Sequence, residues 1–150
     1  MVKNKSRILV ILLALVILGI ALLTFQNTDA NTELSEKVRL GLVKMVEYFG
    51  GDAQRAWWNT PSAIRRLAHT AEYFALGIMS YLVFDRIWLA SVLCVAISFL
   101  DQAVRTLLPI RHFDTGDLAF DALGYITAIF IAGFVGSLVE DYKYKKGLKK

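Results

Sequence analysis

Cysteine, histidine, proline and charged residues are all scarce in this chain. Only 20% of its 150 residues are charged, 56% are hydrophobic, and the mean hydropathy is +0.49. A soluble domain of this length needs more polar surface to cover its core, so the composition argues against a soluble protein. The lone cysteine, Cys94, cannot form an internal disulfide. With two histidines it supplies too few ligands for a structural zinc site, and we assign no metal ligand or cofactor.

The apolar residues come in long blocks, which is typical of transmembrane helices. The first block, residues 8–25, would cover about 27 Å as a helix, close to the hydrocarbon thickness of a bilayer. A cleaved signal peptide is the alternative for this block, but no A-x-A site follows it, so we favour an uncleaved helix or signal anchor. Three further spans are expected at residues 67–84, 87–104 and 118–139.

The stretch between the first two spans, residues 26–66, is more polar and contains one amphipathic helix. Its apolar residues recur at helical spacing, and Gly50-Gly51 would end the helix. We expect this helix to lie on the membrane surface, and the alternative is an ordinary helix packed on the bundle. Asn59-Thr60-Pro61 then predicts the start of the next helix, with a capping residue followed by proline at the first helical position. The apolar stripe consists of Leu34, Val38, Leu42, Met45 and Phe49.

These elements predict a single-domain, all-α integral membrane bundle of four transmembrane helices with one interfacial helix. Residues 1–25 form the first span, residues 67–140 a three-helix core, and residues 141–150 a basic tail. The net charge of +4 gathers near the two ends, which we interpret as topology rather than as nucleic-acid binding. We therefore expect both termini in the cytoplasm and residues 26–66 outside. The basic residues at the ends are Lys3, Lys5, Arg7, Lys143, Lys145, Lys146, Lys149 and Lys150.

Three of the predicted spans carry a polar stripe at the extracytoplasmic end. Ionisable residues inside a membrane are costly and usually face the bundle interior or a cavity, so we predict a functional polar cluster there. Structural pairing that holds three helix ends together is the alternative. The stripes are Arg65, His69, Glu72 and Tyr73 on the second span, Ser98, Asp101, Gln102 and Arg105 on the third, and Arg111, Asp114, Asp117 and Asp121 leading into the fourth.

The fourth span also carries small residues at four-residue spacing, at Gly124, Ala128, Ala132 and Gly136. Small residues let another helix approach closely. We interpret this stripe as helix packing, either inside the bundle or between protomers.

The run from Pro109 to Asp117, followed by Asp121 and Gly124, resembles the signature of VanZ-like proteins. In that family a P-x-R-x-x-[S/D]-x-x-D-x-x-x-N-x-x-G pattern opens the last helix; asparagine is usual where this chain has Asp121. His69 and Tyr73 match a histidine and a tyrosine on an earlier helix. The third helix departs from the family, because Gln102 replaces a glutamate and Arg105 a glutamine. The resemblance covers roughly residues 30–140. The matching signature residues are Arg111, Asp114, Asp117 and Gly124.

The resemblance implies a small bacterial membrane protein of the teicoplanin-resistance VanZ type. Its polar cluster would engage a cell-wall precursor, a lipid head group or a glycopeptide. Arg111 would suit a phosphate or carboxylate, because its planar fork binds either one bidentately. The alternatives are an intramembrane enzyme acting on a lipid-linked phosphate and a non-catalytic subunit that binds another membrane protein or a second copy. The predicted cluster consists of His69, Glu72, Tyr73, Asp101, Arg111, Asp114, Asp117 and Asp121.

Overall fold

The computed structural model describes residues 2–25, 28–107 and 113–147, and side chains are described for residues 6–25, 33–107 and 113–147. The described residues form five α-helices and no strand. The helices are α1 (Val2–Thr24), α2 (Thr28–Tyr48), α3 (Pro61–Phe84), α4 (Ile87–Thr106) and α5 (Thr115–Lys145).

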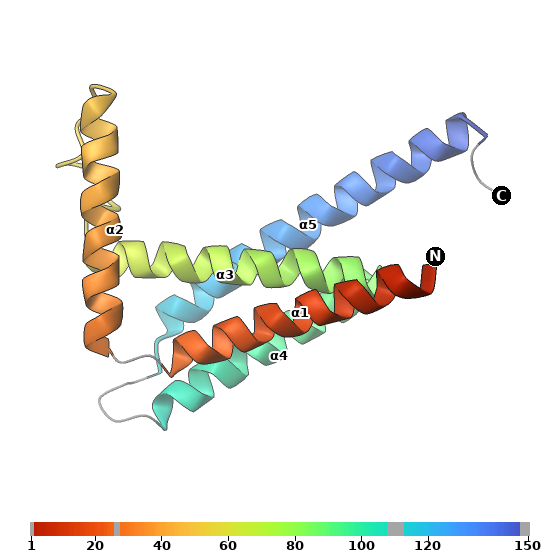
Figure 1. The fold of residues 1–150 in the computed structure, drawn as a ribbon, viewed down its shortest axis with the longest axis horizontal. Coiled ribbons are helices and arrows are strands. Elements are labelled where there is room, and N and C mark those ends of the chain that lie inside the picture. The colour runs from red at the N-terminus through yellow and green to blue at the C-terminus, as the bar shows by residue number, and fades with distance from the viewer. Residues whose placement is uncertain (1, 26–27, 108–112, 148–150) are drawn as a thin grey trace.

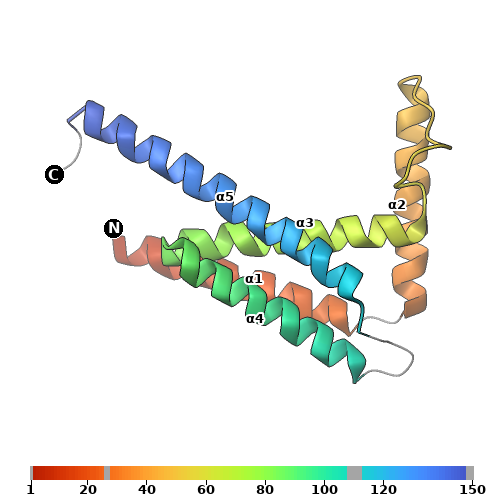
Figure 2. The same ribbon diagram turned by 180° about the vertical axis from the view of Figure 1, so that it is seen from behind.

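Four of the helices form an antiparallel bundle, and α2 lies across one end of it (Figure 1). The helices α1, α3, α4 and α5 are long and apolar enough to cross a membrane, which confirms the predicted all-α membrane bundle. Both chain ends lie at the end of the bundle opposite α2 (Figures 1 and 2). The end nearest α2 therefore collects the last turns of α1 and α4 and the first turns of α3 and α5.

The helix boundaries follow local chemistry. Thr60 caps α3 by accepting a hydrogen bond from the amide of Ala63 at 3.2 Å, and Pro61 occupies the first helical position. Asp85, in the left-handed conformation with φ of 52°, ends α3 and leaves a two-residue connection to α4. The last helix is longer than the predicted span, because Asp114 caps it early and no breaker stops it before Gly147.

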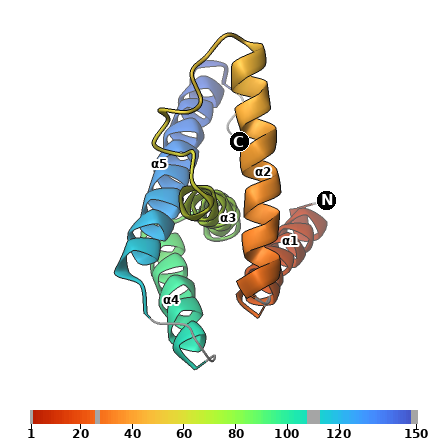
Figure 3. The ribbon, with the colours of Figure 1, turned by 90° about the vertical axis from the view of Figure 1, so that its left-hand side faces the viewer.

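The central helix of the bundle is α3, which contacts each of the other four helices. Seen from the end that α2 covers, α3 lies in the middle of the assembly (Figure 3). Its fully buried Tyr73 and Leu76 join Cys94 of α4 and Ile129 of α5 in one core cluster, together with Leu13 of α1. Every spanning helix is therefore positioned by its contact with α3.

The small-residue stripe of α5 faces α3. A Cβ atom on Gly124 would lie 2.3 Å from the carbonyl oxygen of Thr70, and one on Gly77 would lie 2.8 Å from the Cβ of Ala128. The Thr70 hydroxyl also donates a hydrogen bond to the carbonyl of Phe120 at 3.2 Å. These contacts put Gly124 and Ala128 inside the bundle, where the missing side chains allow the two backbones to approach.

The surface helix α2 ends at Tyr48, next to Gly50 with φ of 79°, as the sequence predicts. The Val43 side chain of α2 is buried, whereas the side chains of Leu34, Val38 and Met45 in the apolar stripe are exposed. The rest of the described chain therefore leaves this stripe uncovered, as expected for a helix on a membrane surface. Arg39 donates a hydrogen bond to the Glu36 carboxylate one turn earlier on α2. It also donates one, at 2.6 Å, to the side-chain oxygen of Asn59, which ties α2 to the segment that precedes α3.

Replacing Gly124 by alanine should destabilise the bundle by about 1–3 kcal/mol, the usual cost of overpacking a well-filled contact. The added methyl group would meet backbone atoms of α3, which cannot move without separating the helices. The measurement is thermal unfolding in detergent. Gly133→Ala is the matched control on the same helix, because its Cβ would have ordinary contacts at 3.5 Å or more. Equal melting temperatures for the two variants would contradict the close approach.

Acid should weaken the Arg39–Glu36 contact within α2. The hydrogen bond from Arg39 holds the pKa of Glu36 below its ordinary value. Because the folded-state pKa is the lower one, the stabilising contact is complete above the ordinary glutamate pKa of about 4.3 and is lost as pH falls through the lowered value. Amide hydrogen exchange across α2, corrected for intrinsic rates, should quicken at low pH. At neutral pH, Glu36→Gln should raise exchange, whereas Glu33→Gln, which removes only an exposed pair with Lys37, should not.

Candidate functional site

Eight buried polar side chains gather at the end of the bundle nearest α2, and we call them the buried polar cluster. They come from all four spanning helices, although they are distant in sequence. Each is at most 9% exposed. The cluster consists of Thr24 of α1, His69 of α3, Ser98, Asp101, Gln102 and Arg105 of α4, and Asp117 and Asp121 of α5.

Arg105 is the centre of the buried polar cluster. Its guanidinium lies 2.8 Å from Asp101 Oδ2, one turn earlier on α4, and 3.6 Å from Asp117 Oδ2 on α5. Both side-chain contacts are buried, since the side chains of Arg105, Asp101 and Asp117 are 9%, 3% and 7% exposed. A charge at this depth is stable only when it is paired. Asp101 pairs with Arg105 within α4, and the contact with Asp117 links α4 to α5.

His69 extends the contacts of Arg105 to α3. The Nη1 atom of Arg105 lies 3.2 Å from His69 Nε2, and Glu72 Oε2 lies 3.5 Å from His69 Nδ1. The Nη2 atom of Arg105 also lies 3.4 Å from His69 Nδ1, so the guanidinium contacts both ring nitrogens. The side chain of Glu72 is 25% exposed, so this chain of contacts runs from the edge of the bundle to its buried carboxylates.

Two of the buried carboxylates are held by hydroxyl groups. Asp121 Oδ2 accepts a hydrogen bond from Ser98 at 2.9 Å, and its other oxygen has no hydrogen-bond partner among the described residues. Asp101 Oδ1 lies within hydrogen-bonding distance of the Thr24 hydroxyl, which joins α1 to α4. The amide of Gln102 is 1% exposed, and neither its nitrogen nor its oxygen has a partner in the part of the chain that the structure describes. Such groups are costly to bury, so they are candidates for contact with a ligand or water.

Partly exposed charges border the cluster where α5 begins. Arg66 of α3 lies 3.6 Å from Asp117 and 3.7 Å from Asp114, and its guanidinium carbon is 5.7 Å from the centre of the Phe120 ring. Asp114 also caps α5, accepting a 2.7 Å hydrogen bond from the amide of Gly116. This border is the part of the site that solvent or a head group would meet first, because the side chains of Arg66 and Asp114 are 39% and 42% exposed.

Most of the predicted site residues lie together. His69, Asp101, Asp117 and Asp121 are members of the buried polar cluster, Glu72 contacts His69, Asp114 lies at the border, and Tyr73 is fully buried in the adjoining core. Arg111 lies outside the described residues. The predicted cluster did not include Gln102 and Arg105, although both belong to the polar stripe predicted on their helix. A functional role for any residue of the predicted cluster stays a prediction.

Two contributors were not expected from sequence. Arg66, rather than Arg65, reaches the carboxylates of α5. The reason is that α5 packs against the face of α3 that carries Thr70, and Arg66 lies one turn before Thr70 on that face. Thr24 closes the first apolar block, and its polar side chain at the end of an otherwise aliphatic helix was the available signal. Only the packing of α1 on α4 shows its partner.

The charge of the buried polar cluster is uneven. Asp101, Asp117 and Asp121 face a single buried guanidinium, that of Arg105. Arginine and hydroxyl contacts occupy several of these carboxylate oxygens. Among the residues that the structure describes, no three acidic, histidine or cysteine side chains are placed to hold one metal ion. The described part of the cluster therefore holds more buried carboxylates than buried guanidinium groups.

Removing the central cation should destabilise the protein strongly. Arg105→Gln would leave Asp101 buried without its cationic partner and Asp117 with only the partly exposed Arg66, and breaking a buried pair in this way costs about 3–5 kcal/mol. Adding Asp101→Asn to this variant should restore part of the loss, which a double-mutant cycle measured by unfolding in detergent would detect. Arg55→Gln is the control, because Arg55 pairs with Asp52 while 91% exposed. Strictly additive effects of the two cluster substitutions would contradict the coupling.

Comparison with known proteins identifies a family. The model of the VanZ/LLP1 family matches residues 8–136. The matched range includes α1 as well as the three helices that resemble VanZ-like proteins in sequence. No protein of curated function and no solved structure matches the chain. Because the family model covers most of the sequence, the chain belongs to the VanZ/LLP1 family.

Proposed function

We propose that this protein acts on the bacterial cell envelope through the buried polar cluster and lowers sensitivity to glycopeptides such as teicoplanin. The observation that carries the proposal is the convergence of three buried carboxylates, one buried arginine and an unpaired Gln102 amide from helices that are distant in sequence. Pairing for stability alone would not require a surplus of negative charge or an unsatisfied amide.

The proposed orientation puts this cluster on the outer side of the cytoplasmic membrane. The basic residues near the chain ends lie at the opposite end of the bundle, and α5 carries Lys143 and Lys145 in its last turn there. Arg86, in the connection between α3 and α4, lies at the same end as the termini. Basic residues flank spans on the cytoplasmic side, so the positive-inside rule favours an extracytoplasmic cluster.

The chemistry of the site suggests how an envelope ligand would be held. Its surplus carboxylates would attract an ammonium group, and the amide of Gln102 offers both a donor and an acceptor. Arg66 at the border would bind a carboxylate or phosphate, because a guanidinium fork matches either group. Cell-wall precursors, lipid head groups and glycopeptides all combine positive and negative groups of these kinds.

The experiment that tests the proposal is growth of a bacterial host under teicoplanin, with the wild-type chain or with Gln102→Leu at matched membrane levels. Leucine has a similar volume and removes only polar atoms that have no partner, so stability should be unchanged or higher. We expect Gln102→Leu to lose the protection that the wild-type chain provides. Gln54→Leu, in the exposed loop before α3, is the matched control and should protect.

Asp117→Asn provides a second substitution, because it removes a charge that contacts both Arg66 and Arg105. It should also abolish protection, whereas Asp52→Asn in the exposed loop should not. Full protection by Gln102→Leu and Asp117→Asn would show that the buried polar cluster has no part in the activity. Absence of protection by the wild-type chain would exclude teicoplanin resistance as its function.

A further inference from the structure

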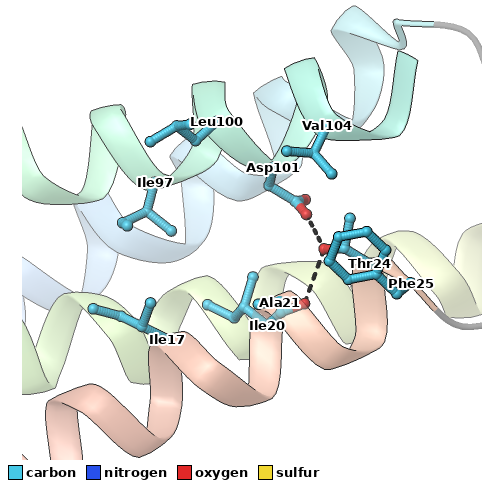
Figure 4. Close-up of a pocket in the computed structure, with 9 residues that line it drawn as sticks. All are labelled: Ile17, Ile20, Ala21, Thr24, Phe25, Ile97, Leu100, Asp101 and Val104. Atoms are coloured by element: carbon cyan, nitrogen blue, oxygen red, sulfur yellow. Dashed lines mark hydrogen bonds between the residues drawn. The ribbon is translucent and has the colours of Figure 1, made fainter. Parts of the chain in front are cut away.

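Two features of the molecule lie outside the buried polar cluster, a groove between helices and an exposed surface of α5. The groove, of about 130 Å³, separates α1 from α4 (Figure 4). Its lining is apolar except for Thr24 and Asp101, which already contact each other across one end. The surface of α5 differs, because it combines exposed apolar side chains with exposed positive charges. It therefore indicates the chemistry of a partner.

The C-terminal half of α5 diverges from the rest of the bundle (Figures 1 and 2). Ile129 is the last buried residue of this helix, although the helix continues well beyond it. Gly136 marks the side that still faces the bundle, because a Cβ atom there would lie 3.1 Å from the Tyr81 hydroxyl. The opposite side of α5 is exposed along its length.

This exposed side changes from apolar to aromatic to basic towards the end of the helix. Its residues recur mostly at intervals of three and four, which places them on one side of a helix. The apolar members are 44% to 52% exposed, and the lysines are exposed as well. We call these residues the outward face of α5: Ile131, Val135, Leu138 and Val139, then Tyr142, then Lys143, Lys145 and Lys146.

The basic end of the outward face carries a net positive charge. Lys146 Nζ lies 4.8 Å from the centre of the Tyr142 ring, so the two side chains share this face. Among the described residues, the three lysines form no ion pair. By helical spacing Glu140 lies on the opposite side of α5 and Asp141 at the edge of the outward face. Basic clusters of this kind at the end of a spanning helix attract anionic lipid head groups.

The order of polarity along the outward face matches one leaflet of a bilayer. From Ile131 to Lys145 the helix rises about 21 Å, at about 1.5 Å per residue. One leaflet with its head groups measures about 20–22 Å, half the thickness of a bilayer. The apolar side chains would therefore lie among acyl chains, Tyr142 at the interface, and the lysines among the head groups.

A second copy of the chain fits the outward face less well than a lipid does. Two copies inserted in the same direction would pair identical faces around a two-fold axis. Their lysines would then lie next to each other, and like charges repel. A negatively charged lipid neutralises the lysines instead.

We propose that the outward face of α5 binds phospholipids with a net negative charge. The phosphate lies at the three lysines, and an acyl chain follows Ile131, Val135 and Leu138. Phosphatidylglycerol should bind in preference to phosphatidylcholine, because both have a phosphate but only the first has a net negative charge. The surface lies outside the buried polar cluster, so this proposal is independent of the proposed function.

The test is photocrosslinking of the full-length chain in bilayers with equal amounts of phosphatidylglycerol and phosphatidylcholine that carry identical acyl chains. A photoreactive residue at Leu138 should crosslink several-fold more to phosphatidylglycerol. Leu123 is the matched control on the same helix, because it is 58% exposed but lies far from the lysines, and the two lipids should crosslink equally there. Equal crosslinking of the two lipids at Leu138 would overturn the proposal, and so would crosslinking mainly to a second copy of the chain.

Removing the positive charges should remove the preference. With all three lysines replaced by glutamine, the crosslinking ratio at Leu138 should fall towards one, and an unchanged ratio would contradict the proposal. The substitutions are Lys143→Gln, Lys145→Gln and Lys146→Gln. The matched control removes three exposed cations near α2 and should keep the preference; it combines Lys37→Gln, Lys44→Gln and Arg55→Gln. High salt should weaken the preference of the wild type, because salt screens exposed charges.

Discussion

The contact on which the end of the bundle nearest α2 depends is the buried ion pair between Arg105 and Asp101, which Asp117 and His69 extend to the neighbouring helices. Asp101 pairs with this guanidinium within α4, and Asp117 of α5, at 3.6 Å, is the carboxylate that joins the two helices. The Gly124–Thr70 approach places α5 against α3 and brings Asp117 to that position. The close packing of Gly124 on α3 and the contact of Asp117 with Arg105 therefore require the same position of α5 along the bundle.

Stability alone does not account for the composition of the cluster. Arg105 compensates part of the charge of three buried carboxylates, and the Gln102 amide is buried without a partner among the described residues. Folded proteins tolerate such local conflicts mainly where function requires them. Relative to the VanZ-like pattern, Gln102 and Arg105 each make the net charge of this polar cluster less negative.

Residues that share a helix face could be assigned from spacing, but their partners could not. The four-residue interval between His69 and Tyr73, and between Asp101 and Arg105, places each pair on one face of a helix whatever the tertiary structure. Whether Arg65 or Arg66 meets α5 depends on the rotation of α3 about its axis, and that rotation depends on the close packing of Gly124 and Gly77. Thr24 acquires its role only because α1 lies against α4.

Hydrophobic length, periodicity and capping are local properties of the chain, so the helical spans, the caps at Thr60 and Gly50 and the polar stripes on three helices could be predicted from the residues alone. Which charges pair, why Arg105 is their centre, and that a groove remains between α1 and α4 follow only from how the helices pack. These features depend on distances between residues far apart in the chain. Helix rotation and packing set those distances, and no local pattern encodes them.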